Sequence, residues 1–302
     1  MTKLRFPFGK TRVNSPRTAI DKSIDPVLRI ARPAGPAGCV IFAAPHSGRC
    51  YPAAWLRDCR LSAAQLRSVE DAYVDQLFAG VPEYGAPLLR ARFARSFVDV
   101  NRARCDLSLS QRDVSGPESA RARVGLGVVP LSIGSDCPIY STEPTRDVIA
   151  HRLSHYYDVY HGALDEAMDA AMAAHGRALL IDCHSMPGAG PMRAPRADIV
   201  LGDRYGMSCD ISVLRFAAET LRAMGYRVAV NHPYAGGYIT QRHGRPSDGR
   251  QALQIEISRA LYMNAVTLRK TSGFEATCQN MDTFARAMIS QFGQIERPVA
   301  AE

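Results

Sequence analysis

The stretch Ala178-Leu179-Leu180-Ile181-Asp182-Cys183-His184 decides the fold, because an uninterrupted apolar run leads directly into an acid and a histidine. Such a run is typical of a strand that is buried on both faces of a sheet. Successive side chains of a strand point to opposite faces, so Asp182 and His184 share one face. In open α/β sheets, ligands bind beyond the carboxyl ends of the strands. We therefore expect His184 at a binding edge, with Asp182 placed to orient its ring.

A second run of the same kind, residues 39–44, ends in Pro45 and His46. Strands that alternate with helices along the chain indicate an α/β fold with a mixed, mostly parallel sheet flanked by helices. No repeat or linker divides the chain, so we expect one domain at 38–302 behind an irregular, proline-rich arm at 1–37. The remaining expected elements are strands at 86–91, 96–100, 199–202, 227–231 and 251–257, helices at 62–80, 145–176, 212–224 and 278–295, and loops at 104–144, 184–196 and 233–244.

Composition excludes several classes of protein. The chain has 302 residues, of which 46% are hydrophobic and 22% charged, as in ordinary globular proteins. No stretch approaches the ~20 apolar residues of a membrane helix, and no secretory signal is visible, so we expect a cytoplasmic protein without a membrane partner. Eight scattered cysteines without a Cys-x-x-Cys pair argue against a disulfide framework or a zinc ribbon.

The net charge of +8 raises the question of an anionic partner. Lysine occurs only four times, so the positive charge is nearly all arginine, spread along the chain without a run of interleaved aromatic residues. This distribution does not favour a nucleic-acid groove. An arginine-rich pocket for a small carboxylate substrate fits the same charge.

Two histidines at two strand ends, His46 and His184, predict a metal site. A catalytic zinc ion takes three protein ligands and leaves one position for water, so a carboxylate is still required. Glu256 stands among apolar residues of a predicted strand, where an acid is costly to bury unless it is paired or bound to metal. The alternatives are a loop histidine at 46, a structural Asp–His pair at 182 and 184, and a solvent-facing acid at 256. The candidate acids are Asp71, Asp75, Asp99 and Glu256.

Arg102 and Arg242 are candidates for binding an anionic substrate. Arg102 ends the segment Asp99-Val100-Asn101-Arg102, and Arg242 lies in the predicted glycine loop. A guanidinium binds a carboxylate through two parallel hydrogen bonds, although either arginine could instead form a structural salt bridge. The chain has neither a Gly-x-Ser-x-Gly elbow nor a phosphate-binding Gly-x-x-x-x-Gly-Lys loop.

Taken together, these motifs run in one order from about residue 40 to 264, and in that order the chain resembles the N-formylglutamate amidohydrolase family. The matching blocks include Pro45-His46-Ser47-Gly48, Asp71-x-x-Val74-Asp75, Val98-Asp99-Val100-Asn101-Arg102, Asp182-Cys183-His184-Ser185-Met186-Pro187, Leu201-Gly202-Asp203-Arg204, Gly236-Gly237-Tyr238 and Gln254-Ile255-Glu256-Ile257.

The resemblance implies a zinc-exopeptidase-like (phosphorylase/hydrolase-like) fold. It also implies metal-dependent cleavage of the amide bond of an N-formyl or other N-acyl amino acid, such as N-formyl-L-glutamate in histidine degradation. It makes His46 and His184 ligands of Zn²⁺ or another divalent metal, and Glu256 the general base. In carboxypeptidase-like enzymes the acidic ligand stands three residues after the first histidine, where this chain has Arg49. We therefore assign the third ligand to Asp71.

The resemblance also implies substrate-binding roles for Asn101, Arg102, Tyr238 and Arg242, with Arg102 in addition acting in catalysis. One departure concerns the substrate, because residues 233–235 read Pro-Tyr-Ala where members matched to formylglutamate have Arg-Phe-Lys. Two alternatives therefore stay open. One is the same fold acting on another N-acyl amino acid or a small peptide, and the other is a non-catalytic relative that binds an anion or nucleic acid. The oligomeric state does not follow from the sequence.

Overall fold

The computed structural model describes residues 24–112, 117–134, 137–188 and 197–293. Within these residues one seven-stranded sheet runs in the order β1-β3-β2-β4-β7-β5-β6. The pairs β1–β3 and β5–β7 are antiparallel, and the other neighbours are parallel. The predicted α/β fold with a mixed, mostly parallel sheet in a single domain is confirmed. The strands are β1 (Leu28–Ala31), β2 (Val40–Ala44), β3 (Leu88–Ala91), β4 (Ala178–Met186), β5 (Ile199–Gly202), β6 (Val228–Val230) and β7 (Arg250–Ser258).

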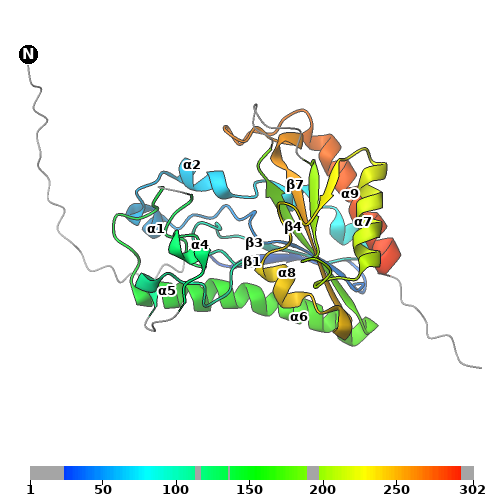
Figure 1. The fold of residues 1–302 in the computed structure, drawn as a ribbon, viewed down its shortest axis with the longest axis horizontal. Coiled ribbons are helices and arrows are strands. Elements are labelled where there is room, and N and C mark those ends of the chain that lie inside the picture. Colours follow the sequence, from blue (N-terminus) through cyan, green and yellow to red (C-terminus); the bar gives the residue numbers. More distant parts are fainter. Residues whose placement is uncertain (1–23, 113–116, 135–136, 189–196, 294–302) are drawn as a thin grey trace, which may run out of the picture.

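Helices flank the sheet on both faces (Figure 1). On one face α6 packs on β4 and β2, and α8 packs on β7; on the other, α9 packs on β2 and α7 on β6. In the described part of the chain, no helix combines the length and the apolar character that crossing a membrane requires. The α-helices are α1 (Ala53–Asp58), α2 (Ala63–Leu66), α3 (Val74–Leu77), α4 (Ala120–Arg123), α5 (Arg146–Arg152), α6 (Asp158–His175), α7 (Ile211–Ala223), α8 (Tyr238–His243) and α9 (Phe274–Phe292), and the π-helical stretch Leu153–Tyr157 joins α5 to α6.

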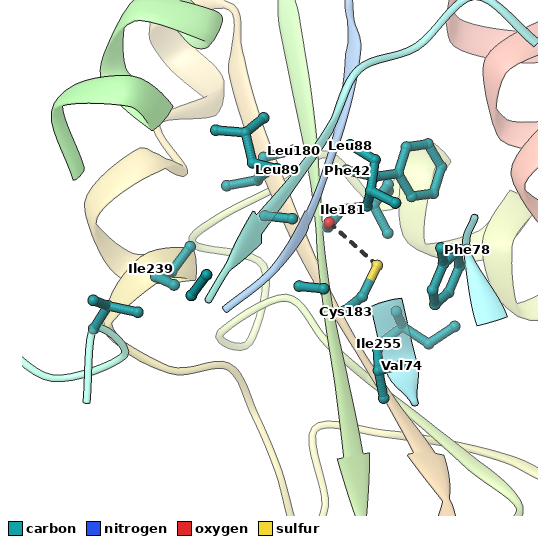
Figure 2. Close-up of a cluster of buried hydrophobic side chains, with 14 of the residues drawn as sticks. Phe42, Val74, Phe78, Leu88, Leu89, Leu180, Ile181, Cys183, Ile239 and Ile255 are labelled. Carbon is teal, nitrogen blue, oxygen red and sulfur yellow. Dashed lines mark hydrogen bonds between the residues drawn. The ribbon is translucent and has the colours of Figure 1, made fainter. Parts of the chain in front are cut away.

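The central strand β4 is buried along its whole length, as its apolar sequence predicts. Figure 2 shows apolar side chains on both sides of the strand, with Cys183 on the same side as Phe78. The Cys183 thiol donates a hydrogen bond to the carbonyl of Ile181 over 3.5 Å. By the alternation of a strand, Asp182 and His184 point to the opposite side from Cys183. They interrupt an otherwise apolar layer at the carboxyl end of the strand.

The predicted helix at 62–80 is wrong in its middle. Ser62 caps α2 through a capping box with Gln65, but the helix ends after a 3₁₀ turn at Arg67–Val69. The backbone N–H of Asp71 then donates to the carbonyl of His46 over 3.0 Å, a contact that a continuing helix would not allow. Consequently Asp71 and Asp75 do not share a helix face.

Four other segments also differ from expectation, the first being residues 184–186, which belong to β4 rather than to a loop. Residues 28–31 of the expected arm form β1, an antiparallel edge strand on β3. Residues 96–100 form turns rather than a strand, since Val98 N–H bonds back to the carbonyl of Ala94 over 3.3 Å. Residues 238–243 of the expected glycine loop form α8.

The short helix α8 is capped from a distant part of the chain. The N–H of Ile239 lies in its first turn and donates to the Asn101 side-chain oxygen over 2.8 Å. The first N–H groups of a helix have no intrahelical partner, so the side-chain amide of Asn101 takes the place of an N-cap side chain. Neither residue gives a local signal for the helix.

Some predictions fall on residues outside the described part of the chain. These are the arm at 1–23, the loop at 189–196 and the end of the last helix at 294–295, together with 113–116 and 135–136 of the long loop region. The boundary of the catalytic domain at residue 38 stays a prediction.

Candidate metal centre and active site

Two histidines and an aspartate meet at the carboxyl ends of β2 and β4. His46 follows β2 by two residues, His184 lies in β4, and Asp71 lies in the bend before α3. The Oδ2 atom of Asp71 is 2.9 Å from Nδ1 of His184 and 3.3 Å from Nδ1 of His46. One ligand atom from each of these three buried residues lies within 4.8 Å of the others. The structure therefore brings together the three residues that the sequence assigned as metal ligands.

The far nitrogen of each imidazole faces a buried carboxylate. Nε2 of His46 donates to Oδ1 of Asp99 over 2.8 Å, and Nε2 of His184 lies 3.1 Å from Oδ2 of Asp182. Asp182 is fully buried, and neither of its carboxylate oxygens has a hydrogen-bond partner among the described residues, so the nearby His184 ring is the group that offsets its burial. Asp99 fixes the ring proton of His46 on Nε2 and leaves its Nδ1 as a free lone pair, whereas Nδ1 of His184 is hydrogen-bonded to Oδ2 of Asp71 over 2.9 Å.

The donor set fits a divalent metal ion. Nδ1 of His46 is buried and has no hydrogen-bond partner in the described structure, although it faces the Asp71 carboxylate. An orphaned imidazole nitrogen beside a second imidazole and a carboxylate is the set that catalytic zinc uses, with a further position left for water. Of the four candidate acids, Asp75 is bound instead to Arg49, whose Nη2 lies 2.7 Å from its Oδ2.

Asp71 is held on its other side by Ser185 and Arg259. Oδ1 accepts from Ser185 Oγ over 3.1 Å and from Arg259 Nη2 over 3.2 Å. Burial opposes ionisation of Asp71, but the hydrogen bond from His184 and the nearby ring of His46 hold its pKa well below the usual range. Asp71 is thus an oriented carboxylate, with one oxygen tied to the protein and the other facing the histidines.

Glu256 lies beside His184 on the neighbouring strand. The two residues are register partners on β7 and β4. Gln254 Nε2 donates to Glu256 Oε1 over 3.0 Å, and Gln254 Oε1 in turn accepts from the N–H of Gly237 over 2.8 Å. Burial raises the pKa of Glu256 to about 7, and the negative charge of Asp71 acts in the same direction. A carboxylate with a raised pKa beside a metal centre can accept and return a proton.

These groups open into one cavity of about 410 Å³ with a cationic lining. Its walls come from His46, the turn at 99–102, the segment 126–133, residues 233–237 and β7. The arginines that line it are Arg95, Arg102, Arg121 and Arg259.

Asn101 and Arg102 line the cavity as expected, but most of their polar atoms contact the protein. The Asn101 amide bonds to Ile239 N–H and lies 3.2 Å from Nε2 of His184. Arg102 Nε donates to the carbonyl of Leu126 over 3.1 Å, and Nη1 donates to the carbonyl of Asn101 over 2.9 Å. Its Nη2 lies 3.7 Å from Oδ2 of Asp99.

Tyr238 and Arg242 do not line this cavity. Because residues 238–243 are helical, Arg242 points to α6 and binds Asp165 there over 2.6 Å. The Tyr238 ring lies 5.8 Å from that of His161, also on α6. The structure thus does not bring these two side chains to the metal centre.

Several residues of the site were missed by sequence reasoning. Arg95 donates to Asp99 over 2.9 Å, and Arg259 and Ser185 hold Asp71. Arg259 follows the carboxyl end of β7, which is a signal that could have found it. Arg121 lies in a segment without periodicity, where the sequence gives no such signal.

Comparison with known proteins shows the family to which the chain belongs. The family model described as N-formylglutamate amidohydrolase matches residues 38–263, about three quarters of the chain. The chain belongs to this family. The resemblance found in the sequence motifs is confirmed, and the chain is a hydrolase that acts on carbon–nitrogen amide bonds.

Individual relatives of the N-formylglutamate amidohydrolase family cover most of the chain. The N-formylglutamate deformylase of Pseudomonas putida is 28% identical over 227 residues, which are 74% of this chain and 81% of that protein. The deformylase of Pseudomonas aeruginosa is 29% identical over 250 residues, 80% of this chain and 87% of that protein. The N-formylglutamate amidohydrolase of Ralstonia eutropha, known from a crystal structure, is 33% identical in sequence. Its structure superimposes with a TM-score of 0.82 over 88% of this chain and 98% of the Ralstonia chain.

Proposed function

We propose that this chain is a metal-dependent deformylase that hydrolyses N-formyl-L-glutamate to formate and L-glutamate. The observation that carries the proposal is the meeting of His46, Asp71 and His184 with Glu256 in one arginine-lined cavity. The names of the relatives support the substrate. A divalent metal held by these three ligands would lower the pKa of a water molecule and polarise the formyl carbonyl.

Glu256 is the general base and then the general acid. It accepts a proton from water as the water oxygen adds to the formyl carbon. The tetrahedral intermediate then collapses with cleavage of the carbon–nitrogen bond, and Glu256 returns the proton to the leaving nitrogen. Gln254 keeps the carboxylate turned into the cavity through its 3.0 Å hydrogen bond.

The charged lining binds and orients an anionic substrate. Arg102 has one guanidinium nitrogen, Nη2, that donates to no backbone carbonyl, and this nitrogen faces a substrate carboxylate or the oxyanion of the intermediate. Asn101 acts by positioning His184 and the first turn of α8 rather than by reaching the substrate. A cytoplasmic location stays a prediction.

The test is release of formate by the purified protein. N-formyl-L-glutamate is compared with N-acetyl-L-glutamate and with a dipeptide that has an amino-terminal glutamate. The proposal expects formate release to exceed hydrolysis of the other two compounds by at least tenfold in kcat/KM. Preferred cleavage of the acetyl compound or the dipeptide would favour the same fold acting on a different N-acyl amino acid or a small peptide. No hydrolysis of any of them would contradict the proposal.

A further inference from the structure

The cavity contains four arginines, and three of them are already engaged by protein groups. Arg95 is paired with Asp99, and Arg259 donates to Ser185, to the Ser68 carbonyl and to Asp71. Arg102 donates to two backbone carbonyls. Of these three arginines, Arg102 keeps one nitrogen, Nη2, that donates to no backbone carbonyl of the described residues.

Arg121 differs from the other three. It lies on the short helix α4, and its exposed side chain lines the cavity. Its guanidinium has no hydrogen bond or ion pair with any residue in the described ranges 24–112, 117–134, 137–188 and 197–293. Its neighbour Arg123, on the same helix, lies 3.9 Å from Glu118 and does not line the cavity.

A chain of charged contacts leads from the metal ligands to Arg102, which lies next to Arg121. His46 contacts Asp99 at 2.8 Å, and Asp99 contacts Arg102 at 3.7 Å. Asp99 acts to raise the pKa of Arg102 and burial acts to lower it, and the positive charge of Arg121 is near enough to lower it further. The carboxylates that act on Arg102 are Asp99, which is also paired with Arg95, and Asp106, whereas no carboxylate of the described residues pairs with Arg121.

An N-formyl dicarboxylic amino acid matches this order of charges. Its formyl group belongs at the metal ligands, its α-carboxylate lies two bonds beyond the amide nitrogen, and its side-chain carboxylate lies farthest away. We infer that Arg121 binds the side-chain carboxylate and so selects glutamate over uncharged N-formyl amino acids. The inference rests on the proposed function and adds to it the residue that reads the acidic side chain.

The segment that carries Arg121 is built as one wall of the cavity. Leu126, Pro130 and Ile133 of the same segment also line it, and Arg102 Nε ties the segment to the metal centre through the carbonyl of Leu126. The apolar members can contact the methylene groups of a glutamate side chain while Arg121 meets its carboxylate. A hydrogen-bonded carboxylate–guanidinium pair then supplies the discrimination.

The experiment compares N-formyl-L-glutamate with N-formyl-L-glutamine, which has nearly the same shape but no side-chain charge. We expect Arg121→Met to lower kcat/KM for the glutamate compound about 10- to 100-fold, mainly through KM, because a charged hydrogen-bonded pair is lost. Turnover of the glutamine compound should stay within about twofold of wild type. Arg123→Met is the matched control and should leave both substrates unchanged, and Arg121→Lys should restore part of the preference.

The outcomes separate this inference from the proposed function. An equal loss on both substrates, no loss on either, or a wild type without preference for glutamate would overturn the role of Arg121 alone. A wild type that releases formate from neither compound would overturn the proposed function and the inference with it. A collapse of the glutamate-to-glutamine ratio in Arg121→Met, with Arg123→Met unchanged, supports the inference.

Discussion

Nε2 of His46 lies 2.8 Å from Oδ1 of Asp99, while Nδ1 of the same ring faces Asp71 and has no hydrogen-bond partner in the described structure. The Asp99 carboxylate thus fixes the tautomer that leaves a lone pair for a metal. Burial opposes its ionisation, but Arg95, Arg102 and His46 hold the pKa of Asp99 well below its usual range.

We expect Asp99→Asn to weaken metal affinity about 10- to 100-fold, because the amide makes the imidazole a poorer ligand and no longer fixes its proton. The measurement is competition for zinc against a chromophoric chelator. Asp169→Asn removes a carboxylate that pairs with Arg250 at the surface and serves as the control. Equal zinc affinity in Asp99→Asn and wild type would show that Asp99 does not orient His46.

Glu256→Gln should lower kcat about 10²- to 10⁴-fold, the usual contribution of a general base, without changing metal content. The substitution keeps the shape of the side chain and removes its ability to accept a proton. Steady-state formate release and elemental analysis are measured on the same sample. Glu275→Gln, at an exposed position on α9, controls for the loss of one negative charge. Activity above about half of wild type would exclude Glu256 as the base.

Gly237→Ala should destabilise the protein and disturb the site. A Cβ atom at Gly237 would overlap the side-chain amide of Asn101, which contacts both His184 and the first turn of α8. Overpacking of this kind typically costs about 1–3 kcal/mol of unfolding free energy. Gly162→Ala is the control, because nothing lies within 4 Å of a Cβ there and α6 should gain about 0.5–1 kcal/mol. Urea unfolding that shows no loss in Gly237→Ala would contradict the packing described.

Stability should fall in acid through two buried histidines. Burial lowers the pKa of both His161 and His243 to about 4, against an ordinary value near 6.5. Between these values the unfolded chain binds protons that the folded protein does not, so unfolding free energy is retained above pH 6.5 and lost as the pH falls toward 4. The loss has an upper limit of about 1.4 kcal/mol per pH unit for each histidine.

His243→Gln should therefore reduce the slope of unfolding free energy against pH between 6.5 and 4. Urea titrations at several pH values measure the slope. His155→Gln changes an exposed histidine on the neighbouring π-helical stretch and is the matched control. A slope in His243→Gln as steep as that of wild type would mean that His243 titrates alike in the folded and unfolded chain.

The buried strands β2 and β4 and two of the three proposed ligands could be predicted because their signals are local. Apolar runs mark β2 and β4, and a histidine at the end of each is visible in the sequence. Asp71 was assigned only through the family resemblance, and its actual setting, a bend tied to the His46 carbonyl, depends on a contact across 25 positions. No periodicity within 62–80 reports that contact.

The arginines show the same limit. Arg242 was expected to bind substrate because it lies beside glycines, but Asn101 caps α8 from 138 residues away and the helix carries Arg242 to Asp165. The role of an arginine depends on whether a carboxylate or carbonyl is near it in space. For Arg102 and Arg121 that information exists only in the folded chain.

The central claim is that hydrolysis requires a metal held by His46, Asp71 and His184. The most direct measurement is formate release from N-formyl-L-glutamate by chelator-treated protein that is titrated with Zn²⁺, with bound zinc determined on each sample. We predict no activity without metal, a linear rise that ends at about one zinc per chain, and no tight zinc binding in His184→Ala. Full turnover by the metal-free protein would contradict the account.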